Sequence, residues 1–138
     1  MGVQLHNNLL ISRSSLLTIL LTNVCEVVFE RRHSPVPGRI KDTVTTRRML
    51  CTNSYKLLRS FYGLRYLGYR PFQRPPHFNP AQKNIIITWD IFMIDYRCIP
   101  MENCYLVKSI TDDESFWELF NNEYSVMSSA QKSIFMDN

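Results

Sequence analysis

The sequence predicts an α+β fold, in which a small two-stranded β unit is packed by two C-terminal helices and preceded by a basic helical extension. Three observations support this prediction. Apolar residues alternate along residues 84–95, a second apolar run covers 102–110, and helix-capping patterns begin at Thr111 and Ser128. An all-α fold is the alternative, because residues 84–95 also place apolar side chains on one helical stripe.

Residues 1–48 are expected to form a poorly ordered extension. Their longest apolar run, residues 16–29, has 14 residues. A membrane-spanning helix needs about 20, so no membrane span is predicted. Residues 31–48 combine arginine pairs with prolines, which indicates a linker. Met49 then opens a stretch without acidic residues, which makes residues 1–48 a candidate for a segment that is missing from the native product.

Residues 49–70 are predicted to be a mitochondrial transit peptide, with a basic surface helix as the alternative. The stretch 47–70 contains six Lys or Arg and no Asp or Glu, a composition that is typical of transit peptides. Its leucines and Phe61 lie on one side of a helical wheel. The membrane potential favours import of a positively charged helix, because each charge that crosses 100 mV contributes about 2.3 kcal/mol of free energy. The residues assigned to targeting are Lys56, Arg59, Phe61, Leu64 and Arg65.

Residues 71–83 are expected to be a proline-rich linker, and residues 84–138 the globular domain. The prolines of the linker remove backbone donors and fix φ, so neither a helix nor a central strand is expected there. A strand is preferred over a helix at residues 84–95, because three consecutive isoleucines favour extended backbone. The second strand is predicted at residues 102–110.

Two helices complete the predicted domain, at residues 112–127 and 129–136. Thr111 opens a capping box before the first helix, and Ser128 opens a second one. The phrase FWELFN in the first helix resembles a short motif of cap-binding translation factors. Because the rest of that pattern is missing, we assign its aromatic residues to core packing rather than to cap binding.

The charge is divided unevenly along the chain. Residues 1–84 contain 13 Lys or Arg and 3 acidic residues, whereas residues 85–138 contain 3 and 9. A domain of fewer than about 60 residues is marginally stable by itself, so the acidic C-terminal domain is expected to rely on a protein partner. The aromatic residues expected to bind this partner are Trp89, Phe116, Trp117, Phe120 and Tyr124.

No catalytic, cofactor-binding or metal-binding residues are predicted. The four cysteines lack the C-x-x-C spacing, and four glycines are too few for a phosphate-binding loop. Cys98 and Cys104 would close a small loop in a secreted protein, but in the mitochondrial matrix free thiols are expected. Asp90 and Asp95 would face opposite sides of a strand, which makes them a poor pair for acid–base catalysis.

These features predict a small non-enzymatic mitochondrial protein, in the matrix or on the matrix side of the inner membrane. It would be an assembly factor or accessory subunit of a respiratory-chain complex and act by docking on another protein. The first alternative is a protein associated with the mitochondrial ribosome or RNA, whose basic arm from Lys56 to Arg74 contacts phosphates. The second alternative is a small secreted protein with a Cys98–Cys104 bridge. Retention of the basic arm in the mature protein favours RNA binding.

Overall fold

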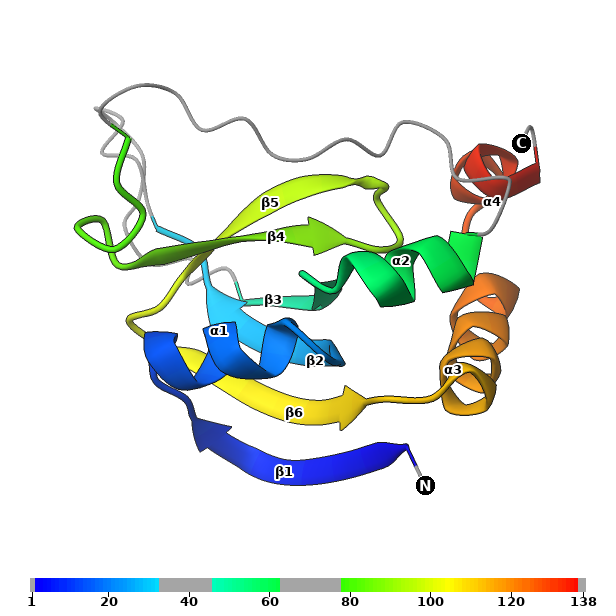
Figure 1. Ribbon diagram of the computed structural model, residues 1–138. Coiled ribbons are helices and arrows are strands. Elements are labelled where there is room, and N and C mark those ends of the chain that lie inside the picture. The colour runs from blue at the N-terminus through cyan, green and yellow to red at the C-terminus, as the bar shows by residue number, and fades with distance from the viewer. Residues whose placement is uncertain (1, 33–45, 63–77, 137–138) are drawn as a thin grey trace, which may run out of the picture.

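The computed structural model describes residues 2–32, 46–62 and 78–136 of the chain. In these ranges, one antiparallel sheet of six strands is accompanied by four helices (Figure 1). The strands are β1 (Val3–Leu10), β2 (Val24–Glu30), β3 (Thr46–Thr52), β4 (Ile85–Asp90), β5 (Asp95–Pro100) and β6 (Cys104–Ile110). The helices are α1 (Arg13–Leu20), α2 (Tyr55–Tyr62), α3 (Asp113–Ser125) and α4 (Ser129–Met136). The strands lie in the order β1-β6-β2-β3-β4-β5.

The predicted fold class is wrong, because the protein is built on one large sheet and not on a two-stranded unit packed by two C-terminal helices. β1, β2 and β3 come from residues predicted to be an extension or a transit peptide, yet β2 lies inside the sheet between β6 and β3. The first strand of the chain pairs with the last, with Val3 opposite Ile110. The sheet therefore crosses the predicted domain boundary at residue 84, and neither side of that boundary contains a complete sheet.

The single strand predicted for residues 84–95 contains β4 and the turn of a hairpin, and the second strand of this hairpin, β5, begins at residue 95. β4 ends at Asp90, and β5 returns from Asp95 to pair along its whole length. In the turn, Ile94 has a left-handed φ of 52°, which is unusual for a β-branched residue. The Asp90 carboxylate accepts a hydrogen bond of 3.3 Å from the backbone N–H of Met93. This turn interrupts an apolar run whose alternation predicted one continuous strand.

The predicted positions of the last strand and of both C-terminal helices are confirmed. α3 begins one residue later than expected: Asp112 is its N-cap and accepts a hydrogen bond of 2.8 Å from the backbone N–H of Ser115. The N–H of Thr111 instead donates to the carbonyl of Gly2 at 2.8 Å, so Thr111 still belongs to the pairing of β6 with the start of the chain. Ser128 caps α4 as predicted, accepting a 3.2 Å bond from the backbone three residues on.

Two apolar clusters stabilise the sheet, and neighbouring residues of β2 alternate between them. Val24 belongs to the cluster beneath α2 and α3, whereas Cys25 belongs to the cluster beneath α1. α1 contributes Leu16 and Leu20, which are fully buried. Leu58 of α2, in the predicted transit peptide, is only 1% exposed. The segments predicted to be dispensable therefore supply part of the hydrophobic core. None of the helices in the three described ranges has the length and apolar character to cross a membrane.

β3 separates from β4 after two residue pairs, and this opens the sheet. β3 pairs with β2 from Cys25–Cys51 to Glu30–Thr46, but it pairs with β4 only at Cys51–Asp90 and Thr52–Trp89. The first half of β3 therefore follows β2 away from β4 and β5. The space between these diverging strands contains the candidate site.

Candidate functional site

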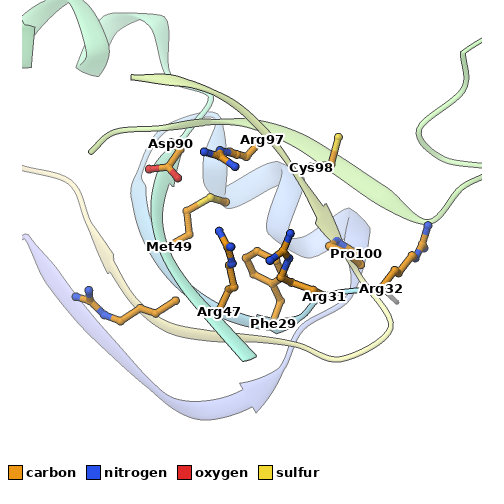
Figure 2. Close-up of a pocket in the computed structure, with 10 residues that line it drawn as sticks. Phe29, Arg31, Arg32, Arg47, Met49, Asp90, Arg97, Cys98 and Pro100 are labelled. Carbon is orange, nitrogen blue, oxygen red and sulfur yellow. The ribbon is translucent and has the colours of Figure 1, made fainter. Parts of the chain in front are cut away.

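A cavity of about 250 Å³ lies where β3 separates from β4 and β5. Its lining includes one acidic residue, Asp90, and Figure 2 shows this side chain on the same side of the strands as those of Met49 and Arg97. The arginines that line it are Arg31, Arg32, Arg47, Arg48 and Arg97. The lining therefore has a large excess of positive charge, which favours an anionic ligand.

Three of these arginines come from three separate segments of the chain. Arg31 directly follows β2, Arg47 lies in β3 opposite Phe29, and Arg97 lies in β5 opposite Thr88. Arg47 is two residues before Met49, which is 6% exposed and packs in the core cluster beneath α1. Because side chains two apart in a strand share a face, Arg47 extends from the rim of this core into the cavity.

Arg31, Arg47 and Arg97 have no hydrogen-bond or ion-pair partner in the part of the chain that the structure describes. Arg31 and Arg47 are exposed to solvent, whereas the Nε atom of Arg97 is buried without a hydrogen bond to any of those residues. Leaving a buried donor unsatisfied costs about 1–3 kcal/mol. An anion that entered the cavity would accept hydrogen bonds from these guanidinium groups and remove that cost.

The other two arginines are already neutralised. Arg32 forms an ion pair with Glu102 and donates to the backbone carbonyl of Lys83. Arg48 lies 2.9 Å from a carboxylate oxygen of Glu26 and 2.6 Å from one of Glu123, so it joins β3 to β2 and α3. Burial by itself raises the pKa of Glu26, but the hydrogen bond and charge of Arg48 and the charge of Lys108 lower it below its usual value. These pairs fix the walls of the cavity and leave the three unpaired arginines to meet a ligand.

Asp90 is the acidic residue among those described residues that line the cavity. Burial raises its pKa above the usual value, and this effect outweighs the opposing influence of the Met93 N–H and of the Arg97 and Arg47 charges. When Asp90 is ionised, it partly offsets the charge of the neighbouring arginines. The strength of anion binding in the cavity therefore depends on this carboxyl group.

Three of the four cysteines are buried thiols. Burial, with a smaller effect of Cys104, raises the pKa of Cys25 to about 12. Burial also raises the pKa of Cys104 to about 11 and that of Cys51 well above its ordinary value. All three are therefore thiols at neutral pH, and the thiolate is the nucleophilic form. Cys98 is exposed and free, and its strand is separated from that of Cys104 by three others, so the bridge that the secreted alternative requires is not formed.

The residues predicted to serve targeting do not form a cluster in the structure. Lys56 and Arg59 are exposed on α2, and Phe61 lies in the last turn of that helix. Leu64 and Arg65 lie outside the described residues. The placement of these residues leaves the prediction of a mitochondrial signal untested.

The residues predicted to bind a partner divide into core and surface. Trp89 and Phe116 are 2% and 1% exposed, so they stabilise the fold and cannot present a docking surface. Phe120 and Tyr124 are partly buried, and their ring centroids lie 6.1 Å apart. Trp117 is the exposed member, with 42% of its surface accessible, and it contacts Phe120 edge to face at 5.2 Å.

The cavity arginines were missed as a set by the sequence analysis. Arg31 and Arg47 belong to the arginine pairs of residues 31–48, a stretch whose prolines indicate a linker. Arg97 has no sequence feature that connects it with them, since 50 residues separate it from Arg47. Only the hairpin of β4 and β5 brings it to the same cavity. In the described ranges, no group of three or more His, Cys, Asp or Glu is arranged to hold a metal ion.

Comparison with known proteins gives no relative for this chain: no family model, no curated protein and no solved structure matches it.

Proposed function

We propose that the protein binds single-stranded RNA without catalysing a reaction, and that the arginine cavity holds one of the phosphate groups. The observation that carries this proposal is the convergence of Arg31, Arg47 and Arg97, none of which forms a direct ion pair with a carboxylate of the described residues. Guanidinium groups bind phosphate oxygens through short, charge-assisted hydrogen bonds. A buried and unsatisfied Nε on Arg97 adds a donor that a phosphate can occupy.

The charge distribution supports RNA over an uncharged ligand. The N-terminal 84 residues contain 13 Lys or Arg against 3 acidic residues. Because β2 and β3 lie inside the sheet, much of this basic segment is needed for folding. Exposed Lys56 and Arg59 on α2 offer further contacts to a polyanion. In this proposal the basic segment is part of the active protein, and the mitochondrial location stays a prediction.

Fluorescence anisotropy with a labelled oligouridine RNA tests the proposal. We expect Arg47→Gln to weaken binding about tenfold to a hundredfold, since a charged hydrogen bond contributes about 1.5–3 kcal/mol and 1.4 kcal/mol corresponds to a factor of ten. The slope of log affinity against log salt should fall by about 0.7 for this one lost phosphate contact. Lys56→Gln is the matched control, because it removes the same charge from an exposed helix. Equal losses in the two variants would show that the cavity has no special role.

Docking on a protein is the second candidate function, and one observation favours it. The indole of Trp117 is 42% exposed although it is large and apolar, and tryptophan is enriched at binding hot spots. In this alternative the protein is an assembly factor or accessory subunit of a respiratory-chain complex. Replacing Trp117 with a photoreactive phenylalanine analogue and irradiating intact cells should then crosslink the protein to a subunit of such a complex. Labelling of RNA alone would exclude this role for Trp117.

A further inference from the structure

We infer that the cavity prefers a doubly charged phosphate monoester, such as the terminal phosphate of an RNA strand, over the singly charged phosphodiester inside the strand. This inference rests on the proposed function and specifies which phosphate the cavity holds. Three features of the site support it: its charge balance, the origin of its donors and its size.

The unpaired charges of the lining match a dianion. Arg32 and Arg48 are neutralised by Glu102 and by Glu26 with Glu123. Among the described lining residues, three guanidinium groups and the carboxyl group of Asp90 remain, which gives a balance of plus two when Asp90 is ionised. A phosphate monoester has a charge of about −1.5 to −2 at pH 7. A phosphodiester has a single charge and would leave part of the positive charge uncompensated.

The donors approach the cavity from two sides, because Arg31 and Arg47 come from the paired strands β2 and β3 and Arg97 from the hairpin of β4 and β5. Arg31 comes from the end of β2, Arg47 from β3 and Arg97 from the edge strand β5, as Figure 2 shows. A terminal phosphate has three free oxygens, one for each guanidinium group. An internal phosphodiester has only two, and its two ester oxygens lead to riboses on both sides. The arrangement of three separate donors therefore suits the terminal group better.

The size of the cavity leads to the same conclusion. Its volume of about 250 Å³ lies below the range of about 300–1,000 Å³ that is usual for sites enclosing a whole small ligand. A phosphate with part of its sugar fits this space, and a terminal phosphate leads to one nucleoside outside the cavity, whereas an internal phosphate leads to two. The base and the rest of the strand would then lie outside the cavity.

The test uses RNA oligonucleotides of one sequence with a 5′-phosphate, a 3′-phosphate or hydroxyl groups at both ends. Binding of each is measured by anisotropy with the intact chain, and methyl phosphate and dimethyl phosphate are added as competitors. We expect a terminal phosphate to tighten binding about tenfold, which corresponds to about 1.4 kcal/mol. Methyl phosphate should compete at lower concentration than dimethyl phosphate. The two phosphorylated strands show which end is preferred.

Three variants connect this preference to the cavity. Arg97→Gln should abolish the advantage of the terminal phosphate, and Arg97→Lys, which keeps the charge, should retain part of it. Lys56→Gln should weaken all three RNAs by the same factor and leave their ratio unchanged. The melting temperature of each variant identifies any that does not fold, and the remaining variants then decide the result.

Each outcome distinguishes the two proposals. Equal affinity for phosphorylated and unphosphorylated RNA would overturn the monoester preference and leave RNA binding intact. If no RNA binds but methyl phosphate still stabilises the protein against heating, RNA binding is wrong and the cavity is a site for a small phosphorylated ligand. If neither RNA nor methyl phosphate binds, both proposals fail.

Discussion

A chain that begins at Met49 should not fold, and this prediction separates the observed sheet from an extension or leader that can be discarded. Loss of residues 1–48 removes β1, α1, β2 and the first residues of β3. β6 would lose both of its neighbours in the sheet, and β3 would lose the strand with which it pairs along its length. The remaining pairing of β4 with β5 is a two-stranded hairpin, which is marginally stable in water.

The magnitude follows from the buried side chains that would be lost. Besides Cys25, the fully or nearly fully buried apolar residues of this segment are Leu16, Leu20, Val24, Val27 and Phe29. Burial of one such side chain stabilises a protein by about 1.5–3 kcal/mol, so five contribute roughly 7–15 kcal/mol. This equals the entire free energy of unfolding of a typical domain, about 5–15 kcal/mol. The shortened chain therefore has too little burial left to remain folded.

Urea titration followed by far-UV circular dichroism measures the effect, with the full-length chain as the reference. The full chain should unfold in one cooperative transition, whereas the chain from Met49 should show no transition and a poorly dispersed amide proton spectrum. A cooperative transition and a dispersed spectrum in the shortened chain would refute the assignment of β2 to the interior of the sheet. In that case residues 1–48 would be dispensable, as the sequence analysis expected.

Three further predictions follow from single side chains. Leu20→Ala should lower the free energy of unfolding by about 2–5 kcal/mol, because Leu20 is fully buried. Leu9→Ala is the control: its side chain is 69% exposed, and the change should be less than about 0.5 kcal/mol. Equal effects of the two variants in urea titration would contradict the packing of α1. Gly2→Ala should lower the free energy of unfolding by about 1 kcal/mol, because an added Cβ would overlap the Asp112 carboxylate and force this N-cap group away from the helix. An unchanged melting temperature would show that Gly2 does not lie against Asp112. Asp90→Asn should tighten phosphate binding, because it removes a negative charge from the cavity. It should also stabilise the protein increasingly as pH rises above about 3.9, because the raised pKa of Asp90 means that its ionisation disfavours the folded state. A variant that is less stable than the wild type at pH 7 would contradict this sign.

The basic segment shows why composition alone does not specify what an amphipathic helix packs against. An import helix and a helix that packs on a sheet need the same pattern, an apolar stripe flanked by basic residues. In α2 that stripe includes Leu58, which is buried in the cluster beneath α2 and α3. The pattern therefore specified an amphipathic helix near residues 55–62, but not the surface that the helix covers.

The candidate site was out of reach of the sequence for a related reason. Arg47 and Arg97 meet only because β3 separates from β4 and because β5 turns back at Ile94. Neither event has a local signature, since the turn lies inside an apolar run and the separation depends on how two distant strands pair. Long-range pairing is a property of the whole sheet and not of any window of sequence.

The sequence by itself determined the elements whose stability is local. α3 and α4 were predicted at their observed positions because side-chain caps and a three-to-four residue spacing act within a few residues, and the last strand was found from its own apolar content. Only the tertiary structure decided that the first 30 residues belong to the sheet, that β1 pairs with β6, and that Arg31, Arg47 and Arg97 surround one cavity. Strand partners are chosen by burial and hydrogen bonding between segments far apart in the chain, and that choice becomes defined only when all the strands are present together.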